Sequence, residues 1–288
     1  MRRSVPDHAF GFGVSRTQLE SRRVTTMTTN PEPAAVVSDR DPRSERGIAL
    51  IVATMATLLM MALGAALLLI TMTETTIARN YSTSSELFYA ADAAAERAVD
   101  DLASIPDWNS VLAGTSASGF VDGLPSGTRT LADGSKLDLT ELLNMANCAK
   151  ATACSGADMD AVTTERPWGP NNPRWQLFAY DKLNDMTPTG TINSPFYVTV
   201  MVGDDPSEND DDPLHDGVPA NPGAGVLALR AEAWGPRGSH KALELTVARV
   251  GAGQLKGGSL PVSGQGLRVL SWREIRQAVA PWTRGPTG

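Results

Sequence analysis

An acidic segment between residues 204 and 216 has the side chains best suited to bind a ligand. It reads Asp-Asp-Pro-Ser-Glu-Asn-Asp-Asp-Asp-Pro-Leu-His-Asp and holds seven acidic residues. Crowded carboxylates repel one another, and hard cations such as Ca²⁺, which take oxygen ligands, relieve that repulsion. The EF-hand spacing is absent, so a solvated acidic loop that shields the end of a hairpin is the alternative interpretation. The predicted calcium ligands are aspartates: Asp204, Asp205, Asp210, Asp211, Asp212 and Asp216.

Catalytic chemistry has little support in the sequence. The chain has three histidines, of which His215 lies in the acidic segment and His240 at a predicted hairpin; we expect both to be surface residues. The one catalytic constellation on offer is a metal-assisted hydrolase that uses His215 and the acidic segment. The motifs G-x-S-x-G and H-E-x-x-H and a phosphate-binding loop are absent from the sequence. We therefore predict a protein that is not an enzyme and has no small-molecule substrate.

Composition narrows the class of partner further. The 288 residues carry a formal net charge of −7, so the basic footprint of a nucleic-acid-binding protein is missing. Hydrophobic residues make up 42%, and the chain contains 26 glycines and 19 prolines. These proportions are typical of a loop-rich globular domain rather than a disordered chain.

The element that must position everything else is a long apolar helix. From Ile48 to Thr73 the chain carries no charged residue, and about 20 apolar residues suffice to cross a ~30 Å hydrocarbon core as a helix. The helical pattern then continues without a proline to about Ala103, and Pro106 ends it. One stripe of this second half has a 4,3,4,3 spacing: Ile77, Tyr81, Ser84, Phe88, Ala91, Ala95, Ala98 and Leu102.

The charges that flank the apolar segment predict its orientation. Arg40, Arg43 and Arg46 precede the segment, whereas Glu74 is the first charge after it. By the positive-inside tendency, the N-terminus stays in the cytoplasm and the C-terminal part is exported. The apolar run is far longer than the core of a secretory signal that is cleaved behind it. We therefore expect a single-pass protein of the inner membrane with an exported head.

Three motifs around this helix resemble the N-terminal region of PilX-type minor pilins. They are R-x-x-R-G-I-A-L-I-V from Arg43, T-E-T-T-I-A-R-N-Y from Thr73, and F-Y-A-A-D-A-A-A-E-R-A from Phe88. The junction Gly47–Ile48 resembles a type III prepilin signal, in which the peptidase cuts after the glycine and the new N-terminus is methylated. A simple signal anchor is the alternative. The predicted leader of 47 residues is long, and Met27 is the start that we hypothesise instead.

The resemblance implies a function as well as a processing site. It implies an α+β, type IV pilin-like fold, a minor pilin of a type IV pilus, and other minor and major pilins, the prepilin peptidase and the inner membrane as partners. Adhesion and motility are the functions to which such a pilus contributes. Major pilins carry glutamate at the fifth residue after the cut, where this chain has Val52, which suggests a tip or initiation subunit. A GspK-like pseudopilin of a type II secretion system and a non-polymerising anchored adhesin or sensor are the alternatives.

The exported part has the period-two pattern of an antiparallel sheet. Four strands are predicted, over residues 175–180, 195–202, 226–234 and 241–250, and residues 267–275 are either a last strand or a surface segment. We expect one apolar face, covered by the stripe from Tyr81 to Leu102, and one wet face. The predicted segments are the leader 1–47, the helix 48–104, a loop-rich connection 105–173, the sheet 174–251 and a Gly-rich end 252–288.

The two cysteines, Cys148 and Cys154, have five residues between them in the loop-rich connection. In an exported segment they are expected to form a disulfide that closes a small loop, with a contribution of about 2 kcal/mol. Their spacing excludes a C-x-x-C redox pair, and a zinc site lacks a nearby histidine. Two free thiols are the alternative that remains open. A short helix is expected just before them, over residues 137–147, with Asp138 or Thr140 as its cap.

Overall fold

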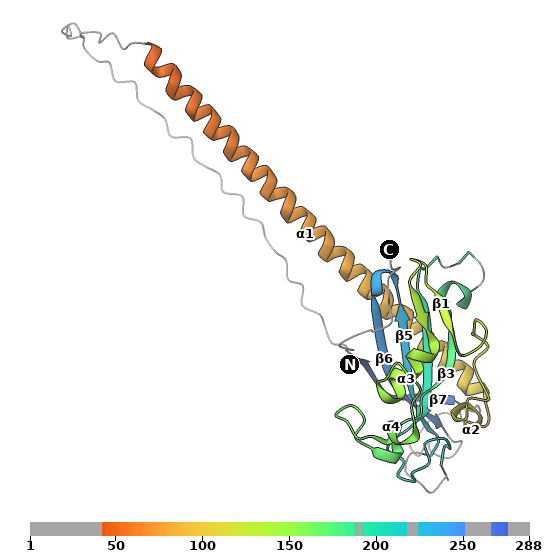
Figure 1. Ribbon diagram of the computed structural model, residues 1–288. Coiled ribbons are helices and arrows are strands. Elements are labelled where there is room, and N and C mark those ends of the chain that lie inside the picture. Colours follow the sequence, from red (N-terminus) through yellow and green to blue (C-terminus); the bar gives the residue numbers. More distant parts are fainter. Residues whose placement is uncertain (1–41, 188–189, 192, 218–223, 251–265, 276–288) are drawn as a thin grey trace, which may run out of the picture. The chain divides into compact units, whose positions relative to one another are not determined.

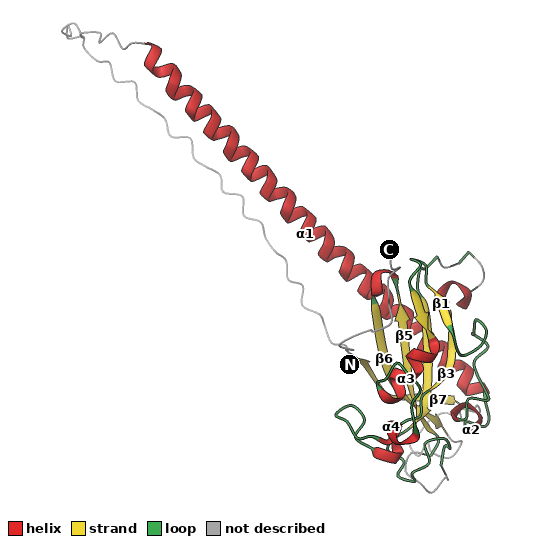
Figure 2. Cartoon of the chain, in the orientation of Figure 1, coloured by secondary structure: helices red, strands yellow, loops and turns green. Residues whose placement is uncertain are grey.

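The computed structural model describes residues 42–187, 190–191, 193–217, 224–250 and 266–275. The chain divides into two units, one up to Gly64 and the other from Ala65 onward, and each is described separately. Residues 1–41 of the predicted leader, which include Met27, and most of the Gly-rich C-terminal segment lie outside the described residues. Figure 1 labels the elements along the chain and Figure 2 shows which segments are helix, strand and loop.

The first element is helix α1, Pro42–Ser104, of 63 residues. It begins before Ile48, where the apolar pattern starts, because Pro42 is tolerated in the first helical turn and residues 43–47 contain no helix breaker other than a single glycine. Among the described residues, one helix is long and apolar enough to cross a membrane by length and composition, Gly47–Ser104. None of its most apolar stretch is buried within the protein.

Threonine hydroxyl groups in this helix form hydrogen bonds to the helix's own backbone. The Oγ1 atoms of Thr71 and Thr73 donate to the carbonyl oxygens of Leu67 and Leu69, each at 2.9 Å. Such bonds to the preceding turn remove the need for water or a side-chain partner. The polar residues at the end of the apolar stretch are therefore compatible with an apolar environment.

The head, the part of the chain that follows α1, is built on a five-stranded antiparallel sheet in which every strand pairs with its neighbours in the sequence (Figure 1). The strands are β3 Gln176–Lys182, β4 Tyr197–Asp204, β5 Val226–Trp234, β6 His240–Val250 and β7 Gly266–Ile275. The four predicted strands are therefore confirmed, with the same bounds for β5. The undecided segment 267–275 is a strand, because β7 pairs with β6 along its length.

One face of the sheet packs on the second half of α1. The buried helix residues on that face are small or aliphatic: Leu87, Ala90, Ala91, Ala94, Ala95, Ala98 and Leu102. They meet the inward residues of β3 to β6, such as Phe178, Val200, Leu229 and Leu243. The predicted cover of the sheet, from Tyr81 to Leu102, is wrong at its beginning, because Tyr81 is 77% exposed. Contact with the sheet sets in only near Leu87.

The opposite face of the sheet is also covered, so the predicted wet face is wrong. All eight residues of β4 are buried, and Glu232, expected on the wet face, has no exposed surface. The cover comes from the connection: strands β1 Thr128–Thr130 and β2 Lys136–Asp138, and helix α3 Leu139–Cys148. Leu137, Leu139 and Leu142 pack there in a second core with aromatic residues in the strands or directly before β3: Trp175, Tyr180, Tyr197 and Trp234. The fold is thus an α+β sheet with a helix on one face and a small β-hairpin and helix on the other.

Local signals explain the short elements of the connection. The Asp138 side chain caps α3 by accepting hydrogen bonds from the backbone N–H groups of Thr140 and Glu141, at 2.9 and 3.0 Å. A disulfide joins Cys148 to Cys154, just before α4 Gly156–Asp160, which begins with a capping box at Ser155. The remaining short helices are α2 Asn109–Leu112 and the 3₁₀ turns η1 Gly169–Asn171, η2 Leu183–Met186 and η3 Pro236–Gly238.

The C-terminal end of α1 is fastened to the head by two side chains. Trp108 is buried, and its indole N–H donates to the carbonyl oxygen of Leu102 at 3.2 Å. The Arg249 guanidinium lies over the Trp108 ring at 4.1 Å and donates to the carbonyl oxygens of Ile105 and Pro106. The indole N–H satisfies a carbonyl in the last turn of the helix, and the guanidinium holds the two residues that follow the helix. Trp108 therefore packs the end of the helix against the head.

Candidate functional site

The predicted processing junction lies within helix α1. Gly47 has open space around it, with no atom within 4 Å of the position that a Cβ would take, and Ile48 is exposed. Gly64, farther along the same helix, has equally open surroundings. The fold of the head therefore makes no demand for glycine at either position.

The apolar stretch that follows Gly47 exposes large side chains along its length. The exposed ones include Leu50, Ile51, Val52, Leu58, Leu59, Leu63, Leu67, Leu68 and Ile70. Soluble proteins seldom leave apolar patches of this extent uncovered, and those that do use them to contact lipid or another protein. Because this surface also has the length needed to span a hydrocarbon core, it is a surface for a membrane or for other apolar helices.

The second half of α1 has the opposite character. Its buried positions are mainly alanines, such as Ala91 and Ala95, which have no exposed surface. Small side chains let two backbones approach closely, here the helix and the sheet. The two halves of one helix are therefore specialised, one with large side chains for an apolar environment outside the chain and one with small side chains for its own sheet.

A second candidate site is an acidic cluster at the end of β4. Ligand atoms of Asp204, Glu208 and Asp216 lie within 4.8 Å of one another. Asp204 is the last residue of β4, and Glu208 and Asp216 belong to the loop that follows. Two of these residues are nearly inaccessible, since Asp204 is 4% and Glu208 1% exposed.

Burial changes the acidity of the cluster. The pKa of Asp204 is raised to about 8 by burial and by the neighbouring Glu208 carboxylate. Burial likewise raises the pKa of Glu208 to about 7, against a hydrogen bond from the backbone N–H of Gly217. Burial also raises the pKa of Asp216, although the N–H of Gly225 donates to its Oδ1 at 2.6 Å. Near neutral pH the cluster therefore resists full ionisation unless a positive charge joins it.

The structure gathers two of the six predicted calcium ligands, Asp204 and Asp216, and adds Glu208. The other predicted ligands are engaged in local contacts. Asp205 accepts hydrogen bonds from Ser207, Asp210 accepts one from the N–H of Asp212, Asp211 donates its N–H to the side chain of Asn171, and Asp212 pairs with His215. Glu208 was missed because the prediction counted aspartates and had no way to tell which side chains turn inward.

The two head histidines differ from each other. His215 is on the surface, as expected, and its pKa is raised by the hydrogen bond to Asp212. His240 is largely buried, so the prediction of a surface residue is wrong. Its ring stacks on Trp234 with centroids 4.0 Å apart, and its Nε2 lies 2.9 Å from Glu232 Oε2. Cross-strand pairing between β5 and β6 places Trp234 opposite His240, which sequence spacing alone does not reveal.

Glu232 joins this group as a buried charge with two cationic partners. Burial by itself raises the pKa of a carboxyl group, but Arg230 and His240 outweigh it and lower the pKa of Glu232 to about 2. Arg230 Nε lies 2.5 Å from Glu232 Oε1. This arrangement stabilises the covered face of the sheet and is not open to a substrate.

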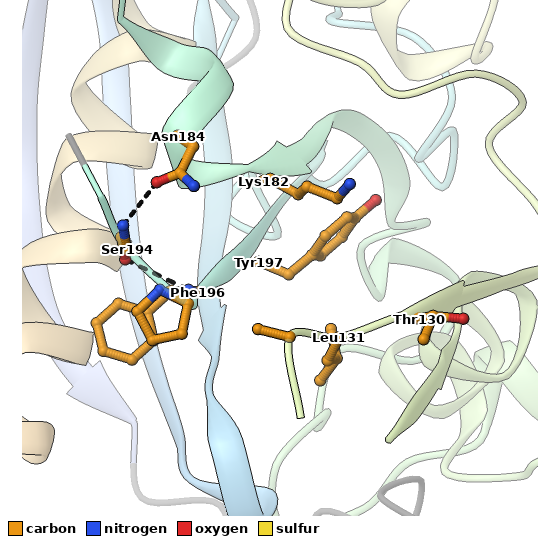
Figure 3. A pocket seen from close by; sticks show the side chains of 9 residues that line it. Thr130, Leu131, Lys182, Asn184, Ser194, Phe196 and Tyr197 are labelled. Atoms are coloured by element: carbon orange, nitrogen blue, oxygen red, sulfur yellow. Dashed lines mark hydrogen bonds between the residues drawn. The ribbon is translucent and has the colours of Figure 1, made fainter. Parts of the chain in front are cut away.

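A small hollow of about 290 Å³ lies between the β1–β2 turn and the segment that connects β3 to β4 (Figure 3). Its walls include Leu131, Lys182 and Tyr197, and the Asn184 side chain accepts a hydrogen bond from the N–H of Ser194 at its rim. The lining side chains show no nucleophile next to a base. The hollow therefore offers no catalytic constellation among the residues that the structure describes.

The comparisons with known proteins fall on the helix. Residues 46–96 match the family model described as PilX N-terminal. No curated protein and no solved structure matches the chain. The matched segment begins next to Gly47 and extends through the exposed apolar stretch into the alanine-rich half of α1 that packs on the sheet.

Proposed function

We propose that this chain, whose N-terminal region is that of a PilX-type pilin, is a minor pilin of a type IV pilus. The observation that carries the proposal is the family match over the helix that exposes large apolar side chains in its first half and packs on an antiparallel sheet with its second. The helix is the assembly element and the head is the part displayed at the surface. No catalytic step belongs to this function.

The exposed apolar side chains and the internal backbone hydrogen bonds of the helix support its residence in a membrane before assembly. In lipid, a helix satisfies all its backbone hydrogen bonds internally, and the exposed leucines and isoleucines contact acyl chains. In a filament, the same side chains contact the helices of neighbouring pilins. Exchange of one apolar environment for the other changes the free energy of the side chains little, so assembly does not require the cost of bringing this surface into water.

In this proposal the prepilin peptidase cuts between Gly47 and Ile48, and the new N-terminus at Ile48 is methylated. Cleavage removes the arginines that precede the junction, of which Arg46 is the nearest. A charge at the end of the helix has to remain at the membrane surface, since its transfer into hydrocarbon is costly. Cleavage therefore replaces the charged leader by a single amino group, which lowers the cost for the helix of leaving the bilayer for the filament.

Two glycine variants test the cleavage. Gly47→Val and Gly64→Val place the same side chain on the same helix at positions with equally open surroundings. On co-expression with a prepilin peptidase, wild type and Gly64→Val should yield a mature chain that begins at Ile48, and Gly47→Val should keep the leader. N-terminal mass spectrometry reads out all three, and on the precursor it also tests whether translation starts at Met27. A mature wild-type chain that still begins upstream of Gly47 contradicts the proposal.

Val52 bears on the place of the subunit in the filament. A glutamate at this fifth mature position pairs, in major pilins, with the N-terminal amine of the adjacent subunit; Val52 has no charge to offer. We propose a tip or initiation position on this ground. Quantitative immunoblots of sheared filaments should find this chain in small, roughly constant amounts per filament, and Val52→Glu should raise the amount incorporated along the shaft.

Filament purification tests the function itself. The mature chain should co-purify with sheared pili, and its deletion should reduce the number of filaments and the adhesion and motility that depend on them. Presence in a type II secretion pseudopilus instead of a pilus would assign the chain to the GspK-like alternative. A mature chain found only in the membrane fraction, with filaments of normal number in the deletion strain, would leave an anchored adhesin or sensor.

A further inference from the structure

The acidic cluster at the end of β4 has the composition and spacing of a cation site. We propose that Asp204, Glu208 and Asp216 bind one Ca²⁺ ion in the head. This inference does not depend on pilus assembly, because it concerns the head alone and is tested on the purified chain. The cluster joins the end of a sheet strand to a loop far richer in acidic residues than the rest of the head.

The spacing of the three ligand atoms suits calcium. Two oxygens bound to the same Ca²⁺ ion, each at 2.3–2.6 Å, lie at most about 5 Å apart. The ligand atoms of the cluster fall within 4.8 Å of one another. Mg²⁺ holds its ligands at 2.0–2.1 Å in a strict octahedron and keeps most of its waters. Three carboxylates positioned by the fold are therefore compatible with the adaptable coordination of Ca²⁺.

The second observation is the state of the Asp204 side chain. Its Oδ1 is buried and has no hydrogen-bond partner among the described residues, in a residue that is 4% exposed. A buried polar atom without a partner is costly, and a buried carboxylate next to another carboxylate is more so. A divalent cation at the cluster supplies the missing partner for Oδ1 and cancels the repulsion from Glu208.

The other two ligands are already held in place by backbone groups. Glu208 accepts hydrogen bonds from the N–H of Gly217 at 3.0 and 3.3 Å. Asp216 accepts one from the N–H of Gly225, and its own N–H donates to the Asn109 side chain of α2 at 2.8 Å. The carboxylates are therefore oriented before any ion arrives, which lowers the entropic cost of binding.

The charges around the cluster leave it strongly negative. Asp205 and Asp210 lie close enough to raise the pKa of Glu208 further, after the effect of its burial. The charge of Arg249, from β6, lowers the pKa of Asp216. The same guanidinium, however, stacks on the Trp108 ring and donates hydrogen bonds to carbonyl oxygens just after the end of α1. A mobile cation is thus the natural counterion, and it ties the acidic loop to the end of β4.

The experiment uses the full-length chain, purified in detergent and freed of metal by a chelator. Isothermal titration with CaCl₂ and thermal unfolding with and without Ca²⁺ are measured on wild type, Asp204→Asn, Glu208→Gln and the control Asp212→Asn. Asp212 is exposed, lies in the same loop and pairs with His215 rather than with the cluster. The control therefore removes the same charge from the same loop without touching a proposed ligand.

Wild type and Asp212→Asn should bind one Ca²⁺ with a Kd of about 10⁻⁴–10⁻³ M, the range of extracellular calcium modules, and 10 mM Mg²⁺ should not displace it. At tenfold excess over Kd, Ca²⁺ should raise Tm by about 3–5 °C. Asp204→Asn and Glu208→Gln should weaken binding at least tenfold. Without Ca²⁺ both variants should unfold at or above the wild-type Tm, since each substitution removes repulsion between carboxylates. Such a Tm shows that the variants are folded. Absence of binding to wild type, or an equal Tm shift in Asp204→Asn, overturns the proposal.

Discussion

Leu59 and Leu102 lie on the same helix and have opposite surroundings. Leu59, in the apolar stretch of α1, is 63% exposed, whereas Leu102, under the sheet, is 1% exposed. The head in turn buries groups that proteins normally keep in water, including Glu232, Asp204 and Glu208. The apolar stretch thus exposes hydrophobic side chains, whereas the head buries carboxylates, of which Glu232 has two cationic partners and Asp204 keeps one oxygen without a hydrogen-bond partner among the described residues.

This difference shows that the two regions are folded for different solvents. The apolar stretch has no core of its own, so its side chains contribute to stability only through lipid or neighbouring helices. The head owes its stability to two cores, one on each face of the sheet. Substitutions of the same type should therefore have different effects in the two regions, and the predictions below test this from the largest effect to the smallest.

The leucine pair gives the largest contrast. Leu102→Ala should lower the free energy of unfolding of the head by about 2–5 kcal/mol, because it leaves a cavity in a packed core. Leu59→Ala should change it by less than about 0.5 kcal/mol. Denaturant titration of the detergent-solubilised chain, followed by fluorescence of the buried Trp108, Trp175 and Trp234, measures both. Equal losses in the two variants would show that the apolar stretch is part of the folded core.

The buried carboxylate of the head should respond to acid. The pKa of Glu232 is about 2 in the folded head against 4.5 ordinarily, so the folded state favours the ionised form. Its stabilising contribution is therefore complete above about pH 4.5 and is lost as the pH falls through about 2. Glu232→Gln should cost about 3 kcal/mol at pH 7, because Arg230 and His240 lose their partner.

Unfolding curves between pH 2 and 7 measure this loss. As the pH falls, the free energy of unfolding of wild type should decrease towards that of Glu232→Gln. The difference between the two free energies should therefore become smaller. Glu244→Gln is the matched control, since Glu244 pairs with Arg273 at a more exposed position of the same sheet. Its free energy of unfolding should differ little from that of wild type at every pH. A gap for Glu232→Gln that does not change with pH would contradict the assignment.

A charge in the apolar stretch should act on the membrane and not on the fold. Leu59→Lys places a cation near the centre of the predicted span and should disfavour insertion by about 2.5–3.5 kcal/mol. Tyr81→Lys, on the exposed part of α1 beyond the apolar stretch, should insert as wild type does. Alkaline extraction of membranes gives the inserted fraction. If the two variants insert equally, the apolar stretch does not span the bilayer.

The disulfide should make the smallest of these contributions. Reduction, or Cys148→Ser with Cys154→Ser, should cost about 2 kcal/mol, since the closed loop is short. The loss should appear in the cover made by α3, because Cys148 is the last residue of that helix, and should leave membrane insertion unchanged. Unfolding curves with and without reductant measure it, and an unchanged curve would mean that the covering segment is held by packing alone.

How far sequence reasoning reached can be seen in β5 and Glu232. The alternation of Val226 to Trp234 predicted a strand whose bounds the structure reproduces, because side-chain period is a local property of the chain. The same alternation placed Glu232 on a wet face, which is wrong, because α3 and the β1–β2 hairpin cover it from nearly a hundred residues away. The acidic segment predicted a cation site, but which of its carboxylates turn inward depends on backbone donors such as Gly217 and Gly225.

By itself, the sequence determined the long helix, its apolar and alanine-rich halves, four strands and the resemblance at Gly47–Ile48, since each depends on residues that are neighbours in the chain or one turn apart. Only the tertiary structure decided that both faces of the sheet are covered, that His240 stacks on Trp234 beside a buried Glu232, and that Glu208 joins Asp204 and Asp216. These features arise from contacts between segments distant in sequence, and burial is a property of those contacts rather than of any single residue.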